Sequence, residues 1–166
     1  MEYKEAKQEF IQAWGALGSK WGINRTMAQI NALLLIAPVP LSTEQIMDEL
    51  GISRGNTNMN VRTLMDWGIV HKVLITGERK EFFRSEKDMW ELASRIAEQR
   101  KKKEIEPLVK IMDRLKDAKG TGPEVEEFNR MTKEIADFSK KMDGILDKFI
   151  RADQHWFTRS VKNVLK

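Results

Sequence analysis

The sequence predicts a mainly α-helical fold that contains one β-hairpin, and two observations support this. Residues 42–51 and 53–68 have the pattern of two short helices, each with a capping residue before it and a glycine at its end. Residues 69–84 contain two β-rich runs separated by a polar turn, which is the pattern of a hairpin. Two short helices followed directly by a hairpin with a charged tip predict a winged helix-turn-helix with a two-stranded wing.

The composition limits the class of protein. A chain of 166 residues suits one domain with appendages, or one domain that completes its core by dimerising. With 41% hydrophobic residues and five tryptophans, the chain is expected to fold. It has no cysteine, so it has neither disulfides nor thiolate metal ligands. No apolar run approaches the roughly 20 residues that span a bilayer, and the N-terminus lacks a signal-peptide core, so we expect a cytoplasmic protein with no membrane contact.

The charge is compatible with nucleic acid as a partner. The net charge is +4 and the isoelectric point is about 9.3. The basic excess is not concentrated in residues 20–87, which contain the predicted winged helix. Any positive patch on that part must therefore come from the way the chain folds.

The first two helices are expected to build much of the core. A helix over residues 2–17 has an apolar stripe and is expected to end at Gly18. The stripe consists of Phe10, Ile11, Trp14 and Leu17. Asn24 is a good cap for a helix over residues 25–37, which is apolar nearly all round and is therefore predicted to be central.

The next two helices form the helix-turn-helix. Ser42 is expected to cap the first, with Gln45 in the capping-box position and Gly51 as the stop. Ser53 is expected to cap the second, and Gly68 is expected to close it in the left-handed conformation. The inward face of this second helix is predicted to consist of Thr57, Val61 and Leu64.

The hairpin comes next, with strands over 69–75 and 80–84 and a turn over 76–79. Ser85 can cap a long helix, with Asp88 in its first turn. Its predicted inward face consists of Trp90, Leu92, Ala93, Ile96 and Ala97. The charged run over 100–104 is interpreted as a solvated helical segment, followed by a kink or break at Pro107.

The C-terminal part is also expected to be helical. After the break at 119–123, residues 124–150 form a helix with a heptad-like, phenylalanine-rich stripe that needs a long partner. A last short amphipathic helix contains Trp156, Phe157, Val161 and Leu165. The expected division is therefore an N-terminal dimerisation helix at 1–19, a winged-helix DNA-binding domain at 20–87 and a helical dimerisation region at 88–166.

The span from Leu17 to Arg84 resembles the MarR-type winged-helix transcriptional regulators, and it looks most like their GbsR-like branch. The motifs that carry the resemblance are LGISRGNTNM at 50–59, LMDWGIV at 64–70 and the wing ITGERKEFF at 75–83. The resemblance implies a homodimeric DNA-binding regulator, often a repressor released by a small effector, and some similar members respond to choline. Met59 departs from the commoner winged-helix pattern, where arginine is frequent at that position.

The predicted DNA contacts come from three places. The second helix of the motif presents residues suited to base edges or phosphate, since arginine pairs well with guanine and asparagine with adenine. They are Ser53, Arg54, Gly55, Asn56, Asn58, Met59 and Arg62. Arg79 and Lys80 at the wing tip suit the DNA backbone or minor groove, although a solvated hairpin tip is the alternative. Ser42 and Thr43 begin a helix whose N–H groups can bind a phosphate, and simple capping by Ser42 is the alternative.

An effector site, if present, is expected to be aromatic. Trp14, Trp21, Trp67 and Trp90 are the candidates, because aromatic faces can hold a quaternary ammonium group by cation–π attraction. The alternative interpretation is that these tryptophans belong to the core or to the dimer interface.

The sequence does not indicate an enzyme. His71 and His155 lie far apart in the sequence and outside any ligand-spaced motif, and there is no phosphate-binding, metalloprotease or nucleophile motif. We therefore expect no catalytic site, no metal and no cofactor. The alternative function is a winged helix that serves as a protein-interaction or assembly module, which a neutral or apolar recognition face would favour.

Overall fold

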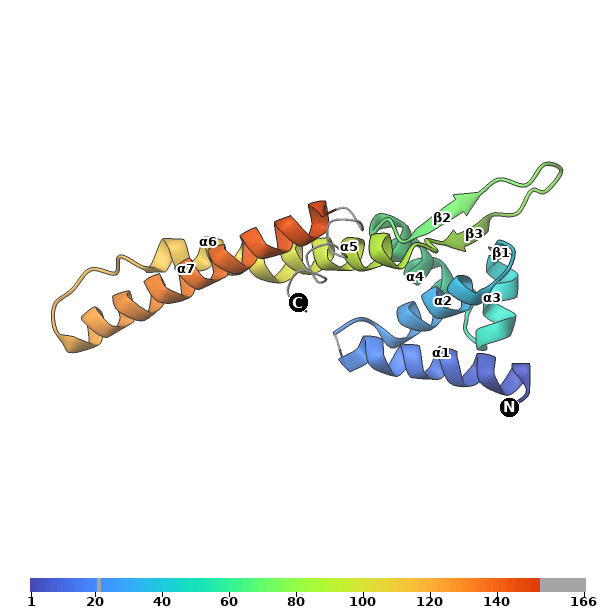
Figure 1. Cartoon of the computed structure of the whole chain (residues 1–166), viewed down its shortest axis with the longest axis horizontal. Coiled ribbons are helices and arrows are strands. Elements are labelled where there is room, and N and C mark those ends of the chain that lie inside the picture. The colour runs from blue at the N-terminus through green and yellow to red at the C-terminus, as the bar shows by residue number, and fades with distance from the viewer. Residues whose placement is uncertain (21, 153–166) are drawn as a thin grey trace, which may run out of the picture. The chain divides into compact units, whose positions relative to one another are not determined.

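Helices and one small sheet make up the computed structural model, which describes residues 1–20 and 22–152 (Figure 1). The mainly helical fold that the sequence predicts is confirmed. The chain divides into two units, Met1–Leu92 and Ala93–Lys166, each with its own packing.

Helices α1 (Tyr3–Lys20) and α2 (Arg25–Ile36) lie side by side in the first unit. Asn24 caps α2 as predicted, because its side chain accepts a hydrogen bond from the Met27 amide at 3.1 Å. The predicted end of α1 at Gly18 was wrong, since the helix continues to Lys20. Gly18 lets the two helices approach closely: a Cβ at this position would lie 2.6 Å from the Cβ of Ala28.

The helix-turn-helix forms as the sequence predicts. Helix α3 (Thr43–Leu50) starts with a full capping box between Ser42 and Gln45 and ends at Gly51, which has a left-handed φ of 64°. Helix α4 (Arg54–Asp66) is capped by Ser53, and Gly68 adopts a φ of 73° just after it. The three residues predicted to face inward on α4 are all at most 1% exposed: Thr57, Val61 and Leu64.

The sheet has one strand more than the sequence predicts. Strands β2 (Val70–Val73) and β3 (Phe82–Ser85) form the antiparallel wing, and the short β1 (Leu41–Ser42) pairs with the other edge of β3. The strands are shorter than predicted, which leaves residues 74–81 as a loop that projects beyond the sheet (Figure 1). Two-residue strands such as β1 have no periodicity, so the sequence does not reveal them.

Helix α2 supplies much of the core of this unit, as its apolar sequence predicts. The largest side chains that are nearly fully buried come from α2, α3, α4 and β3: Ile30, Leu33, Leu34, Ile46, Leu64 and Phe83. The amide of Asn31 donates a hydrogen bond to the Ser85 hydroxyl at 2.9 Å, and both residues are buried. This bond attaches the end of β3 to α2.

The helix after the wing begins later than predicted, so the expected places of Ser85 as its cap and of Asp88 in its first turn were both wrong. Ser85 does not cap the next helix, because its hydroxyl is buried on β3 and donates to the carbonyl oxygen of Ile69 at 3.3 Å. Asp88 is the cap of α5 (Met89–Arg100), since its carboxylate accepts from the Trp90 amide at 2.8 Å. Nearby, the Lys87 ammonium donates to the carbonyls of Leu35 and Ala37 at 2.6 and 2.7 Å, which satisfies the C-terminal end of α2.

The second unit contains most of α5, the π-helical turn η1 (Lys101–Ile105), α6 (Glu106–Leu115) and α7 (Pro123–Arg151). Of the kink or break predicted at Pro107, the break was wrong, because α5, η1 and α6 follow one another without a gap and the backbone at Ile105 and Glu106 is helical. The π-helical turn directly before Pro107 accommodates its missing N–H. Ala93, predicted to face inward, is exposed, whereas Leu92 is 1% exposed as predicted. The predicted last helix lies outside the described residues.

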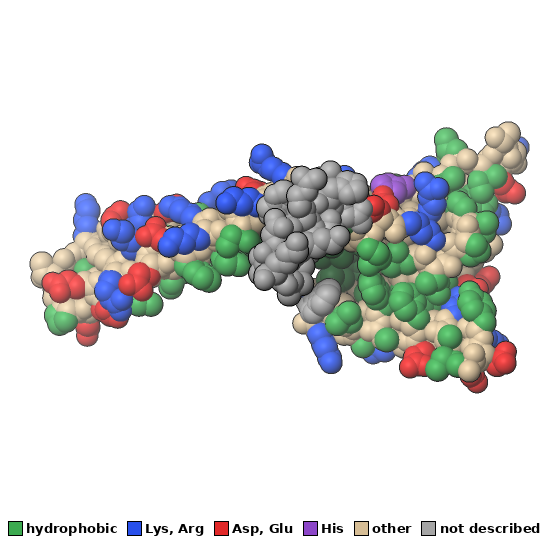
Figure 2. Space-filling model, in the orientation of Figure 1, with side chains coloured by type: hydrophobic (Ala, Val, Ile, Leu, Met, Phe, Trp, Pro, Cys, Tyr) green, Lys and Arg blue, Asp and Glu red, His purple; other side chains and the backbone are tan. Residues whose placement is uncertain are grey.

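Helix α7 packs on α6 and η1 through small side chains. The buried residues of α7 are Thr132, Ala136 and Ser139. Its large apolar residues stay exposed, by 65% for Phe138 and 57% for Ile145. Figure 2 shows hydrophobic side chains gathered along one edge of this helical unit. The stripe predicted from the heptad-like spacing is therefore present, and within the described residues of its own unit it has no partner of matching size.

Candidate nucleic-acid interface

The outward side of α4 presents most of the predicted DNA contacts to solvent. Six of the seven candidates on or beside this helix are exposed: Ser53, Arg54, Gly55, Asn58, Met59 and Arg62. Asn56 is half-buried, and the exposed Ser53 uses its hydroxyl to accept from the Asn56 amide at 3.3 Å. The fold therefore places these residues together on one surface, while the cap reduces what the Ser53 hydroxyl can offer to a ligand.

The buried side chain of Asn60 fixes the side chain of Asn56 by hydrogen bonds. Its buried amide nitrogen donates to both the backbone carbonyl and the side-chain oxygen of Asn56, at 2.8 and 2.7 Å. Because a carboxamide oxygen has two acceptor sites, Asn56 keeps one of them and its own NH₂ donors. Asn60 was not predicted, since an asparagine on the inner face of a helix gives no sequence signal for such a role.

Both arginines of α4 make ion pairs with glutamates. Arg54 Nη2 lies 2.8 Å from Glu44 Oε1, and Arg62 Nη2 lies 2.8 Å from Glu81 Oε2. All four side chains are partly exposed, so these pairs are in contact with water. The sequence did not indicate either pair, because Glu44 on α3 and Glu81 in the wing loop lie ten or more positions away from their arginines.

The wing adds further basic side chains. Arg79 and Lys80 lie in the exposed 74–81 loop, as predicted for the tip. Lys72 on β2 donates to Glu81 Oε1 at 2.5 Å, so Glu81 binds two cations at once. This hydrogen bond from Lys72 is the main reason that the pKa of Glu81 is below its ordinary value.

At the start of α3, the structure shows the capping that was the alternative interpretation of Ser42. Ser42 and Thr43 are only 3% and 7% exposed, and the Ser42 hydroxyl accepts from the Gln45 amide at 3.3 Å. Glu44 covers the same helix end: its own backbone N–H lowers the pKa of its carboxyl, followed by the hydrogen bond from Arg54. A phosphate at this helix end would therefore meet backbone N–H groups in competition with a carboxylate, and no serine or threonine hydroxyl.

The tryptophans proposed as an effector site come from different elements. Trp14 on α1 makes a ring contact with Phe10, with a centroid distance of 5.6 Å. Trp67 forms the C-cap of α4, and Trp90 lies in the first turn of α5. Trp21 lies outside the described residues. The aromatic effector site stays a prediction.

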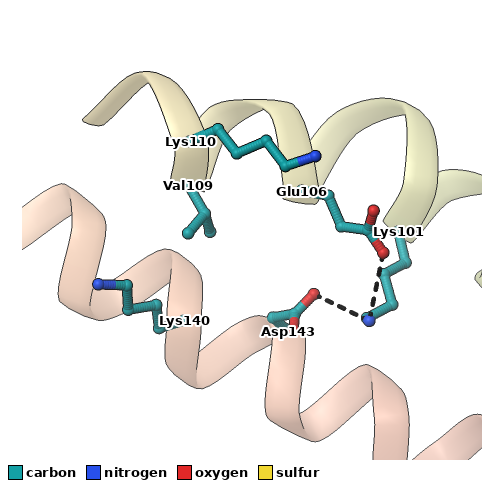
Figure 3. Close-up of a pocket in the computed structure, with 6 residues that line it drawn as sticks. All are labelled: Lys101, Glu106, Val109, Lys110, Lys140 and Asp143. Carbon is teal, nitrogen blue, oxygen red and sulfur yellow. Dashed lines mark hydrogen bonds and ion pairs between the residues drawn. The ribbon is translucent and has the colours of Figure 1, made fainter. Parts of the chain in front are cut away.

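A charged pocket lies within the second unit, between η1–α6 and α7 (Figure 3). It is lined by Lys101, Glu106, Val109, Lys110, Lys140 and Asp143. Lys101 reaches Asp147 at 3.1 Å, Asp143 at 3.3 Å and Glu106 at 3.4 Å, and the hydrogen bond to Asp147 contributes most to raising its pKa to about 12. The expected solvated run at 100–104 was therefore wrong for Lys101, which ties the π-helical turn to α7. The pocket contains no aromatic residue.

Other kinds of site are not evident in the part of the chain that the structure describes. Within residues 1–20 and 22–152, no three His, Asp or Glu side chains are placed to hold a metal ion. Over the same residues, no helix has both the length and the apolar character that a membrane crossing requires.

Comparisons with known proteins agree with the fold and the motifs. Residues 21–80 match the model of the MarR family. The chain is 26% identical over 77 residues to the HTH-type transcriptional regulator MmpR5 of Mycobacterium tuberculosis, a match that covers 46% of this chain and 47% of that protein. The chain thus spans about half the length of this curated relative. A crystal structure described as a transcriptional regulator superposes with a TM-score of 0.66 over 87% of this chain and 95% of that one, at 19% identity, which shows a shared fold.

Proposed function

We propose that this chain, which contains a winged-helix domain of the MarR family, is a sequence-specific DNA-binding transcriptional regulator that acts as a homodimer. The observation that carries the proposal is the outward polar side of α4 next to a basic wing. Over α4 and the hairpin, six lysines and arginines accompany three aspartates and glutamates. A surface with this excess of positive charge suits a duplex better than a neutral protein partner. The family match also supports the expectation that the protein is not an enzyme.

In the proposed complex, α4 enters the major groove. Arg54 and Arg62 exchange their glutamate partners for guanine edges or phosphates, and Asn56 offers its free donors and one acceptor to adenine. Arg79 and Lys80 contact the backbone or the minor groove beside the helix. The remaining candidates at Gly55, Asn58 and Met59 would complete the contact surface by backbone approach and packing.

The dimer is proposed to form through helices of the N- and C-terminal parts. Residues 1–19 and 88–166 contain the large apolar side chains that α1 and α7 leave exposed or half-buried. In a twofold dimer the two α4 helices would meet half-sites about 34–36 Å apart, one turn of the duplex. The GbsR-like assignment, the repressor role, the cytoplasmic location and a small effector that shifts the spacing of the two helices belong to the same proposal. An effector acts this way only if it binds the two spacings with different affinity.

Selection of random duplexes by the purified protein, with sequencing of the retained fraction, tests the proposal directly. We expect an enriched site with two inverted half-sites, because a twofold dimer presents the same surface twice. If no sequence is enriched although the protein is folded, the regulator proposal is wrong and the protein-interaction alternative gains support.

Removal of base-reading side chains should then reduce specificity. We expect Arg54→Ala or Asn56→Ala to weaken binding to the selected site by about 1–3 kcal/mol, and to weaken binding to random DNA less, since each side chain reads a base edge. Fluorescence anisotropy with both duplexes measures the two losses. An equal loss on both DNAs would show that these residues contact phosphates and not bases.

The wing should contribute mainly through charge. We expect Arg79→Ala to weaken binding to every duplex and to reduce the slope of log affinity against log salt by about one, because one phosphate contact is lost. Lys119→Ala is the matched control, since it removes one exposed positive charge from the loop before α7. A slope unchanged in Arg79→Ala, or lowered equally in Lys119→Ala, would remove Arg79 from the contact surface.

A further inference from the structure

The ion pairs at the base of the wing carry one inference that rests on the proposed function and extends it. We propose that Glu81 is a specificity-determining residue, which occupies Arg62 and Lys72 so that only a cognate duplex gains their full contribution. Glu81 places a negative charge on the proposed DNA-facing surface, beside cations that would otherwise be available to phosphates.

The geometry links three elements through one side chain. Glu81, just before β3, accepts from Arg62 of α4 at 2.8 Å with Oε2 and from Lys72 of β2 at 2.5 Å with Oε1. Each carboxylate oxygen therefore takes one cation, and the recognition helix is connected to the wing. Arg62 uses one of its five N–H donors in this contact, so the others remain available to a ligand.

The exposure of the cluster makes the contacts exchangeable. The side chains of Arg62, Lys72 and Glu81 are 53%, 38% and 35% exposed. Ion pairs at this level of exposure are weak, so a duplex can replace the carboxylate as the partner of either cation. The two cations also hold the pKa of Glu81 below its ordinary range, so the carboxylate stays charged at neutral pH.

Competition of this kind affects random and cognate DNA differently. Random DNA offers mainly phosphates, and its binding comes from counterion release at each neutralised phosphate. When a cation leaves Glu81 for a phosphate, it exchanges one anion for another, and Glu81 then lies uncompensated beside the duplex. A cognate site adds a two-bond contact between a guanine edge and arginine, which offsets that loss. Specificity is the difference between the two affinities, so it increases when Arg62 stays on Glu81 beside random DNA and leaves it only for a guanine edge.

The same arrangement recurs at the other end of α4. Arg54 pairs with Glu44 at 2.8 Å, and Lys80 of the wing is also near enough to Glu44 to favour its charged form. Each arginine on the outward side of α4 is therefore held by one carboxylate from a neighbouring element. This repetition is the second observation behind the proposal, because a solvated helix face does not require a glutamate at each arginine.

The test compares Glu81→Gln with the unaltered full-length protein. Binding to the selected duplex and to a random duplex of equal length is measured over a range of salt concentrations. For Glu81→Gln we expect affinity for random DNA to rise about 3–10-fold at low salt, with a salt slope steeper by about one, because released cations reach the phosphates. Affinity for the selected duplex should change less, so the ratio of the two affinities should fall at least about threefold.

Glu78→Gln is the matched control. It removes the same charge from the same loop, and within the described chain Glu78 makes no ion pair. Its effect on the affinity ratio should be clearly smaller, and Glu81→Asp should restore part of the ratio that Glu81→Gln loses. A ratio that Glu81→Gln leaves unchanged, or that both glutamine variants lower equally, would overturn the inference while the proposed function stands. If the unaltered protein prefers no sequence, the proposed function and this inference fail together.

Discussion

Replacement of Phe83 by alanine is expected to lower the free energy of unfolding of the first unit by about 3–5 kcal/mol, the range for removal of a buried phenylalanine ring. Phe83 is 1% exposed and lies on the central strand β3, where it pairs with Leu41 of β1 and Lys72 of β2. Phe83 therefore lies at the position of the sheet that is flanked by both edge strands. Loss of the ring leaves a cavity that the well-packed surroundings can only partly fill.

Phe82→Ala provides the matched control for this prediction. Phe82 is the neighbouring residue on β3, but its side chain points to the other face and is only half-buried. The same chemical change there should cost clearly less. Urea unfolding followed by circular dichroism measures both values, and equal losses at the two positions would contradict the assignment of Phe83 to the core.

Replacement of Phe138 by glutamate is expected to raise the dissociation constant of the proposed dimer by more than about 100-fold. Burial of one phenylalanine side chain contributes about 1.5–3 kcal/mol, and a twofold interface buries two copies, so their loss amounts to several factors of ten. Phe138 is 65% exposed on α7, so the change should leave the fold of one chain nearly intact. Sedimentation equilibrium measures the constant, and circular dichroism checks the helix content.

Lys133→Glu is the control for the dimer prediction. It also places a glutamate on the exposed surface of α7, but five residues away and so on another face of the helix. It should leave the dissociation constant within a few-fold of the unaltered value. A dimer that survives Phe138→Glu would show that the exposed stripe of α7 is not the interface.

Local signals in the sequence predicted the start and end of most helices correctly. Asn24, Ser42 and Ser53 cap their helices, and Gly51 adopts the left-handed conformation, because these effects depend on residues within one turn. The outward side of α4 followed in the same way from the buried positions of Thr57 and its partners on the inner face. Capping and helical periodicity were enough to place most of the candidate site on one surface.

Contacts between segments that are distant in the chain could not be predicted from the sequence. Gly18 looked like a helix end because its close contact with Ala28 depends on how two helices cross. Ser85 looked like a cap because its true partner, Asn31, lies 54 positions away. The glutamates that hold Arg54 and Arg62 are unremarkable in sequence, since glutamate on an exposed position normally indicates only solubility. These contacts decide how much charge the surface presents, which is why the electrostatics of the site required the structure.

The two-residue strand β1 has a mechanical consequence. Ser42 pairs with Phe82 of the wing and also begins α3 through its capping box with Gln45. One residue thus joins the hairpin to the first helix of the motif without an intervening linker. A displacement of the 74–81 loop that tilts β3 would therefore also move Ser42 and the start of α3. The orientation of the wing is in this way coupled to the orientation of α3.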